Sequence, residues 1–136
     1  MSALELQKSL VLIVDDEFLI AQGLCMQVEE MAMVVCGTAT NADEALALAM
    51  MHRPEVVLMD IRLRGDKDGV DAAREIHRTV GSKVIFITGS REPETLARIK
   101  GDHPAAVLFK PISEGQLISA IRAVIDDPEH RPPALA

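Results

Sequence analysis

Apolar runs recur five times along the chain, and a stretch with helical spacing follows each run. The runs cover residues 9–14, 33–37, 55–59, 83–88 and 105–109. Three of them are almost continuous in Val, Ile, Leu, Met or Phe and do not alternate with polar residues. This pattern is typical of parallel strands that helices cover on both faces. It predicts an α/β fold.

The intervening segments carry apolar residues three or four positions apart, as amphipathic helices do. The expected buried faces of the first and third helices are Ile20, Leu24, Val28 and Met31, and Val70, Ala73, His77 and Val80. Two pairs have the spacing of a capping box: Asn41 with Glu44, and Ser113 with Gln116. Pro93 suits a first helical residue, and Gly81 and Gly101 suit helix ends. Five βα units result.

Five such units with right-handed crossovers make an open, doubly wound sheet whose ligand crevice lies beyond the carboxyl ends of the strands. Polar residues gather at that edge: Asp15 and Asp16, Asp60, Thr88, and Lys110 follow or end the first, third, fourth and fifth runs. If the first and third strands are neighbours, their spacing of about 4.8 Å brings Asp16 and Asp60 within reach of one small ligand. Clustered carboxylates suit a hard divalent cation such as Mg²⁺. The sequence therefore predicts a metal site at this edge.

Thr88 and Lys110 indicate an anion bound beside the cation, and a phosphoryl group meets that requirement. Catalysis of phosphoryl transfer consists mainly of positioning the group and stabilising its charge. In this hypothesis Asp60 is the nucleophile, while Asp15 and Asp16 organise Mg²⁺. Thr88 donates its hydroxyl to the phosphoryl group, and Lys110 pairs with another phosphoryl oxygen.

The composition narrows the class of protein. The 136 residues, 49% of them hydrophobic, suit one compact domain. A formal net charge of -7 and a pI near 5.0 argue against a nucleic-acid surface. With no leader pattern and no apolar run of membrane-spanning length, we expect a cytoplasmic protein without membrane contact. Cys25 and Cys36 lack disulfide or metal spacing, which predicts two reduced thiols.

The motifs VDDE, LMDIRL, FITGS and FKP stand in this order, each at the end of a successive apolar strand. From roughly Leu10 to Ile125 the chain therefore resembles the receiver domain of two-component response regulators. The resemblance implies a single-domain, flavodoxin-like (βα)5 fold with strand order 2-1-3-4-5. It also implies phosphorylation of Asp60 by a sensor histidine kinase or a histidine phosphotransfer protein, with Mg²⁺ required.

The resemblance carries further site details. It implies that the backbone carbonyl of Arg62 completes the metal shell that Asp15, Asp16 and Asp60 begin. It also implies that the peptide bond between Lys110 and Pro111 is cis, which proline permits and which would orient the lysine.

Several positions depart from the family pattern. The segment DIRLRGDKDG lacks the proline that often follows the phosphorylated aspartate, and it is slightly long. Val107 stands where most receivers carry an aromatic residue that moves inward when the threonine engages phosphate. Phe109 lies on the same side of the strand and is a candidate for part of that role, although core packing is its ordinary interpretation. Ser90 and Arg62 occupy positions that tune phosphoryl lifetime in the family.

We expect residues 9–126 to form the receiver domain, with an N-terminal extension over 1–8 and a flexible tail over 127–136. No output domain is expected, so the message would pass through protein partners of a monomer or weak dimer. By analogy with the family, the contact surface surrounds the fourth helix, fifth strand and fifth helix. Its candidate residues are Arg91, Leu96, Lys100, Val107 and Gln116.

Two other functions remain open at this level. One alternative is a scaffold that binds its partner without phosphate, and another is a phosphate sink, which accepts phosphoryl groups without passing on a signal. An aspartyl-phosphate hydrolase would require a second aspartate two residues after Asp60, where this chain has Arg62. We therefore expect no enzymatic activity beyond self-phosphorylation and autodephosphorylation. Four histidines lack ligand spacing and are expected to be structural: His52, His77, His103 and His130.

Overall fold

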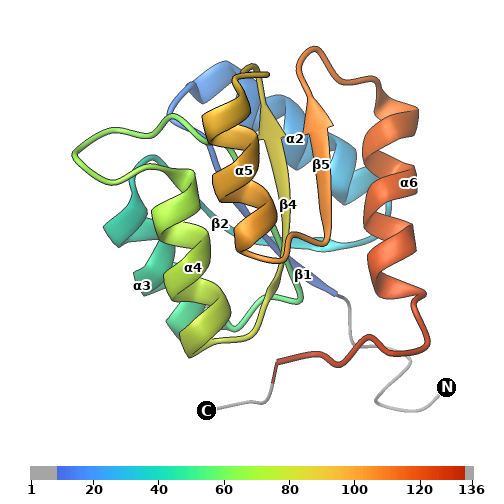
Figure 1. Ribbon diagram of the computed structural model, residues 1–136. Coiled ribbons are helices and arrows are strands. Elements are labelled where there is room, and N and C mark those ends of the chain that lie inside the picture. The colour runs from blue at the N-terminus through green and yellow to red at the C-terminus, as the bar shows by residue number, and fades with distance from the viewer. Residues whose placement is uncertain (1–8, 134–136) are drawn as a thin grey trace, which may run out of the picture.

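A single parallel sheet forms the centre of the computed structural model, which describes residues 9–133. Its strands are β1 (Leu10–Val14), β2 (Val34–Ala39), β3 (Val56–Met59), β4 (Lys83–Thr88) and β5 (Ala106–Phe109). They lie in the order β2-β1-β3-β4-β5, and every neighbouring pair is parallel (Figure 1). The predicted flavodoxin-like α/β fold and strand order are confirmed.

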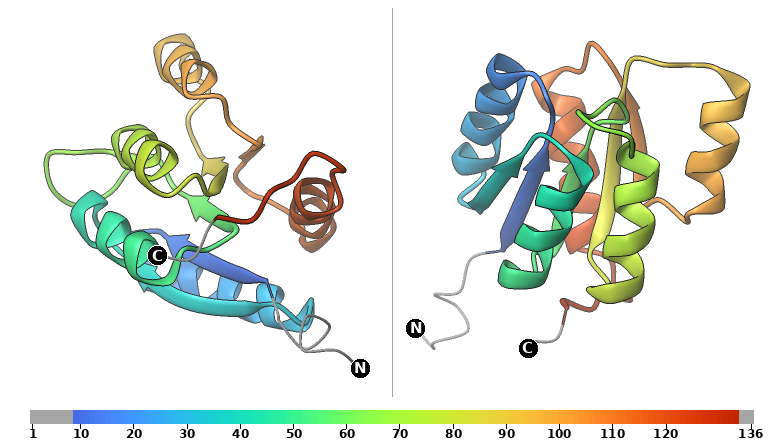
Figure 2. Two further views of the ribbon diagram at one scale, coloured as in Figure 1. Left: turned by 90° about the horizontal axis from the view of Figure 1, so that it is seen from below. Right: turned by 90° about the vertical axis from the view of Figure 1, so that its left-hand side faces the viewer.

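Helices cover both faces of this sheet, as Figure 2 shows in two further views. They are α2 (Phe18–Glu30), α3 (Ala42–His52), α4 (Gly69–Thr79), α5 (Pro93–Gly101) and α6 (Glu114–Ile125). One hydrophobic cluster joins the sheet to α2 and α6, and the other joins it to α3, α4 and α5. The sheet is therefore the middle of three layers.

Strand β1 shows why the apolar runs do not alternate with polar residues. Val11 and Ile13 belong to the cluster under α2 and α6, whereas Leu12 and Val14 belong to the cluster under α3 and α4. All four side chains are buried. Because each face of the strand is covered, every position must be apolar.

Of the two predicted capping boxes, one forms in full and the other only in part. Ser113 and Gln116 satisfy each other's backbone amides at the start of α6. Asn41 accepts a hydrogen bond from the Glu44 amide at 2.8 Å, but the Glu44 carboxylate reaches back to the amide of Thr40. The start of α3 is therefore stabilised by both side chains, although one partner lies a residue earlier than expected.

Two local expectations need correction. Strand β2 continues to Ala39, two residues beyond the predicted end, because Thr38 and Ala39 pair with the end of β1. His77 is exposed rather than buried, and Ile76 takes its place on the buried face of α4. Helix α5 ends at Gly101, as expected, and the left-handed residue after this helix is His103 at φ 51°.

The end of the described chain packs against the sheet. Residues 127–133 belong to the expected flexible tail, yet the His130 side chain is only 6% exposed and lies 3.6 Å from a Glu55 oxygen. An Asx-type hydrogen bond from the Glu129 amide to Asp127 shapes this turn. The expected extension over 1–8 and the last three residues of the expected tail lie outside the described residues.

Candidate functional site

Three carboxylates come together at the carboxyl edge of the sheet. Asp15 follows β1 and Asp60 follows β3, the strand beside it, while Asp16 is the next residue along the chain. One oxygen from each of them lies within 4.8 Å of the other two. Asp15 and Asp60 are 3% and 7% exposed, so two of the carboxylates are removed from bulk water. The predicted neighbourhood of these aspartates is therefore present.

The backbone amides of Asp15 and Asp60 continue the hydrogen bonding of the sheet beyond the ends of β1 and β3. The Asp15 amide donates to the Ala39 carbonyl at 3.0 Å, and the Asp60 amide donates to the Val14 carbonyl at 2.9 Å. One oxygen of each side chain is also held locally, by the Glu17 amide for Asp15 and the Ile61 amide for Asp60. These contacts orient both carboxylates and leave their second oxygens directed to other partners.

Lys110 is that shared partner. Its Nζ atom lies 3.5 Å from Asp15 Oδ2 and 3.3 Å from Asp60 Oδ2. The Lys110 amide donates to the Thr88 carbonyl at 2.8 Å, so the residue extends the pairing of β5 with β4. The following bond to Pro111 is cis, as the resemblance implied. The lysine thus brings positive charge to the two buried carboxylates from the carboxyl end of the edge strand β5.

The electrostatics of the cluster follow from burial and like charge. Burial raises the pKa of Asp60 to about 6, with the neighbouring charge of Asp15 acting in the same direction and Lys110 opposing both. Desolvation acts to lower the pKa of Lys110, but the two carboxylates outweigh it and the pKa is raised. The site therefore holds more negative charge than one lysine balances.

A small cavity opens over these residues. Its volume is about 250 Å³, and its lining comprises Asp16, Glu17, Asp60, Arg62, Thr88, Gly89, Ser90 and Lys110. Oxygen ligands with excess negative charge are what Mg²⁺ prefers, and the three clustered carboxylates fit such an ion. The cavity beside them has room for a phosphoryl-sized anion.

Thr88 ends β4 at the edge of this cavity and is 1% exposed. Its Oγ1 accepts a hydrogen bond from the Ser90 amide at 3.0 Å. A hydroxyl that accepts a bond still has its own proton to donate. Thr88 is therefore placed to donate toward the cavity.

Gly69 is a site residue that sequence reasoning missed. Its amide donates to the Ile61 carbonyl at 2.6 Å, and a Cβ atom here would overlap the carbonyl oxygen of Asp60. The first turn of α4 therefore lies directly against the backbone of the candidate nucleophile. Asp68 and Asp71, which form a full capping box, hold this turn. Their three-residue spacing around a glycine was the signal that could have found it.

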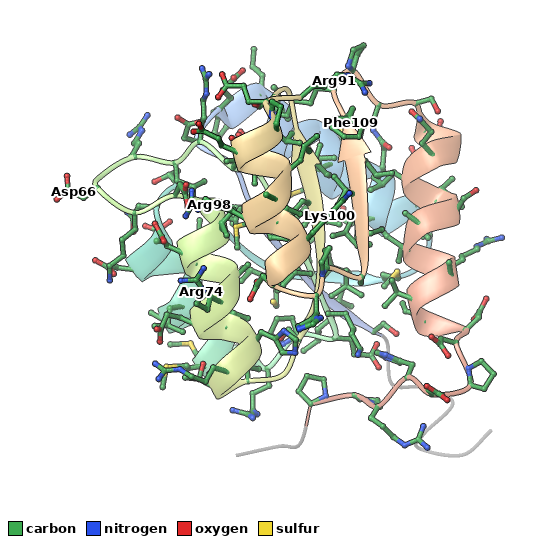
Figure 3. All side chains as sticks on the ribbon, in the orientation of Figure 1. Asp66, Arg74, Arg91, Arg98, Lys100 and Phe109 are labelled. Carbon is green, nitrogen blue, oxygen red and sulfur yellow. The ribbon has the colours of Figure 1, made fainter. Side chains whose placement is uncertain are left out.

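The loop between β3 and α4 has its own shape, as the long segment predicted. It projects from the molecule, with Asp66 at its tip directed into solvent (Figure 3). Arg64 forms an isolated bridge with Asn41, and Lys67 pairs with Asp43 at 3.3 Å. The loop is thus attached to the start of α3.

Val107, which replaces the aromatic residue found in most receivers, and Phe109 have different partners. Val107 packs on the cluster beneath α3, α4 and α5. Phe109 is half-buried, and the Arg91 guanidinium lies 4.0 Å from the centre of its ring. Figure 3 shows both residues at the end of the molecule where β4 and β5 finish. Phe109 thus carries a cation–π contact with the loop that follows Thr88.

The remaining candidates lie away from the acidic cluster. Among residues 9–133, the one group of His, Cys, Asp and Glu side chains with metal-ligand proximity is the aspartate triad. None of the four histidines belongs to it. Cys25 and Cys36 are free and belong to hydrophobic clusters on opposite faces of the sheet. Within the same residues, no helix has the length and hydrophobicity needed to cross a membrane.

Comparison with known proteins identifies the family. The family model for the response regulator receiver domain matches residues 11–122. The chain belongs to this family and is a receiver domain of two-component signalling.

Curated relatives agree with this assignment. The chain is 33% identical over 115 residues to the transcriptional regulatory protein PdtaR of Mycobacterium tuberculosis, covering 85% of this chain and 56% of that protein. It is 34% identical over 112 residues to the phyllosphere-induced regulator PhyR of Methylorubrum extorquens, covering 82% of this chain and 41% of that protein. The chain therefore spans about half the length of the curated relatives it matches.

Solved structures share the fold. The signal receiver domain of a modulated diguanylate cyclase from Desulfovibrio desulfuricans superposes with a TM-score of 0.83 at 36% identity, covering 88% of this chain and 95% of that one. The receiver domain of PhyR from Erythrobacter litoralis gives 0.80 at 30% identity, covering 96% and 99%.

Proposed function

We propose that the chain is a phosphorylation-dependent signalling switch whose phosphoryl acceptor is Asp60. The observation that carries the proposal is the Lys110 ammonium, 3.3 Å from a buried Asp60 oxygen within a triad of carboxylates. Burial removes solvating water from these carboxylates, which costs free energy. Clusters of buried charge of this kind are concentrated at functional sites. Membership of the receiver family supports the same conclusion.

The chemical step transfers a phosphoryl group to a carboxylate. An Asp60 oxygen attacks the phosphorus atom, the bond from phosphorus to the donor breaks, and the donor leaves with the electron pair. Asp60 must be ionised to attack, and a pKa of about 6 leaves it mostly ionised at neutral pH. Lys110 stabilises the charge on the phosphoryl oxygens, and Thr88 donates its hydroxyl to one of them.

Asp15, Asp16 and Asp60 would hold Mg²⁺, with the Arg62 backbone carbonyl as a further ligand. When bound, Mg²⁺ supplies positive charge beside the acceptor carboxylate and the incoming phosphoryl oxygens. Asp15 and Asp60 are already oriented by backbone amides, so they need little rearrangement to accept the ion. Beyond its own phosphorylation and dephosphorylation, we propose no enzymatic activity for the domain.

A histidine-bearing donor protein must reach the cavity, so the surface beside it must be a contact surface. Phe18 and Leu19 begin α2 next to the acidic residues and are 71% and 82% exposed. An open cavity of about 490 Å³ continues from α2 to Pro111 and Ile112. Exposed apolar side chains next to a cavity are typical of a protein docking surface. We propose that a sensor histidine kinase or a histidine phosphotransfer protein docks here.

A scaffold that works without phosphate is the second candidate. The exposed apolar residues of α2 favour protein binding whether or not Asp60 is modified. The two candidates differ in whether the aspartate triad is needed, and one experiment separates them.

The test is incubation with Mg²⁺ and acetyl phosphate, followed by intact mass measurement. We expect one phosphoryl adduct that requires Mg²⁺ and is absent from Asp60→Asn. The matched control is Asp66→Asn, which removes an exposed carboxylate from the same loop and should retain the adduct. Absence of any adduct, together with undetectable Mg²⁺ binding, would favour the scaffold.

A further inference from the structure

Residues 127–133, the tail segment, turn back across the amino ends of the strands, at the edge of the sheet opposite the aspartate triad (Figure 1). The Asp127 side chain accepts a hydrogen bond from the Glu129 amide at 2.8 Å, and the Asp127 carbonyl accepts one from the His130 amide at 2.9 Å. These bonds are local, so they shape the segment without attaching it to the sheet. The His130 side chain, in contrast, is buried against the fold and is only 6% exposed.

Glu55, which lies against His130, has a fixed position directly before β3. Its amide donates to the Leu10 carbonyl at 3.0 Å, and its carbonyl accepts from the Lys83 amide at 3.0 Å. The Ser82 hydroxyl, on the neighbouring loop, donates to the carbonyl before Glu55 at 2.7 Å. The sheet therefore holds this carboxylate in place beneath the tail segment.

The contact between the two side chains is incomplete. His130 Nε2 lies 3.6 Å from Glu55 Oε1, which is about 0.7 Å longer than a usual N–H···O hydrogen bond. Within residues 9–133, the Glu55 Oε2 atom and both ring nitrogens of His130 are buried and have no hydrogen-bond partner. Buried polar atoms without partners cost free energy. A small approach of the two side chains would join them and remove part of this cost.

The charged groups around His130 favour its protonated form. A cavity of about 310 Å³ lies beside the imidazole, and apolar residues of α6 and β5 form part of its wall. Ionisable groups reach His130 from four places: the residue before β3, the start of β4, the loop before β5, and the tail segment itself. They are Glu55, Lys83, His103, Asp127 and Glu129. Three carboxylates thus face one lysine, and His103 adds positive charge only when it is protonated.

We propose that His130 and Glu55 form a proton-dependent latch that fastens the tail segment to the amino edge of the sheet. When the imidazole gains a proton from solvent, both ring nitrogens carry hydrogen, and Nε2 donates to the Glu55 carboxylate in a charge-assisted bond. When that proton leaves, the attraction between opposite charges is lost and the segment loosens.

The direction of the pH dependence follows from the imidazole. Histidine is the side chain whose ordinary titration falls between about pH 5 and pH 8. The latch therefore tightens as the pH falls below neutral and loosens as the pH rises. It goes beyond the proposed phosphorylation of Asp60 and does not depend on it, because the two sites lie at opposite edges of the sheet.

Exchange of the Glu129, His130 and Arg131 amide hydrogens with water, measured by NMR, tests the latch. Each rate is divided by that of an unstructured peptide covering 127–133 at the same pH, which removes the intrinsic pH dependence of exchange. In the unmodified chain, we expect about threefold to tenfold greater protection at pH 5.5 than at pH 7.5. His130→Gln and Glu55→Gln should both lose this difference, since each leaves one partner without an opposite charge.

The matched control is His77→Gln, which removes an exposed imidazole from α4 and should leave the difference unchanged. His103→Gln removes the other imidazole at the cavity and should also retain it. Equal protection at both pH values in the unmodified chain overturns the latch, and so does a difference that survives in His130→Gln. None of these variants alters the aspartate triad, so failure of the latch and failure of Asp60 to acquire a phosphoryl adduct are separate results.

Discussion

Asp60 is a carboxylate that the fold buries at a cost to its own stability. In the folded chain its pKa is raised to about 6, compared with about 4 for an unfolded aspartate. The folded state therefore holds the proton more tightly. The associated stability is fully present below about pH 4 and is lost as the pH rises to about 6 and above.

Asp60→Asn should therefore stabilise the metal-free protein at neutral pH by about 1 to 3 kcal/mol. The gain should shrink toward pH 4.5, where the wild-type carboxyl is mostly protonated. Urea unfolding in EDTA at pH 4.5 and pH 7.5 measures this difference. A gain of equal size at both pH values would contradict the assigned cause, and Asp66→Asn serves as the exposed control.

The burial of the two cysteines determines the reactivity of their thiols. Burial raises the pKa of the Cys36 thiol to about 11 and raises that of Cys25 as well. The thiolate is the form that reacts. At pH 8, Cys36 should react with iodoacetamide about 100-fold more slowly than a cysteine of ordinary pKa. Mass spectrometry of peptides over time measures this rate, and rapid labelling of Cys36 in the folded chain would contradict the prediction.

At the scale of secondary structure, two helical glycines have opposite surroundings. Gly69 packs on the Asp60 carbonyl, so Gly69→Ala must displace the first turn of α4. We expect a loss of about 2 to 3 kcal/mol in unfolding free energy and slower adduct formation. Gly23, within α2, has open space where a Cβ would lie. Gly23→Ala should therefore stabilise the protein by about 0.5 to 1 kcal/mol.

Urea unfolding followed by circular dichroism compares the two glycine variants directly, because both make the same chemical change within a helix. Similar effects of both substitutions would mean that the close approach of α4 to Asp60 is not a constraint. The prediction thus links one element's position to the site.

Local patterns predicted these elements well where one interaction dominates. Ser113 and Gln116 form the predicted capping box because its partners are only three residues apart. The extra residues of β2 could not be seen, since Thr38 and Ala39 are extended by pairing with β1. His77 was placed on the buried face by spacing alone. Ile76, one residue earlier, is buried instead and packs in the cluster under α3, α4 and α5.

For the whole molecule, metal binding should appear as added stability. An ion that binds only the folded state contributes about 2.7 kcal/mol at 100 times its dissociation constant. Mg²⁺ should therefore raise the melting temperature, and more so at pH 7.5 than at pH 5, because Asp60 must lose its proton to bind. Asp16→Asn should abolish most of the shift, whereas Asp66→Asn should preserve it. Equal shifts in both variants would contradict a site at the triad.

The apolar runs and helical spacing along the chain predict the five βα units and the residues at the carboxyl ends of the strands. These features can be predicted because burial on both faces demands unbroken apolar runs and because parallel strands end at one edge. The sequence therefore predicts five site residues: Asp15, Asp16, Asp60, Thr88 and Lys110. The tertiary structure brings the three aspartates together as expected and adds the ion pairs of Lys110 with Asp15 and Asp60, which the sequence did not predict.

The contacts between the helices and the site depend on tertiary packing and could not be predicted from the sequence. Arg98 and Asp68 are thirty residues apart, and their contact depends on the relative placement of two helices. Gly69 lies against Asp60 because the long loop returns α4 to the end of β3. His130 is buried because the chain after α6 crosses back to Glu55. Such contacts depend on packing between distant segments, which no local periodicity records.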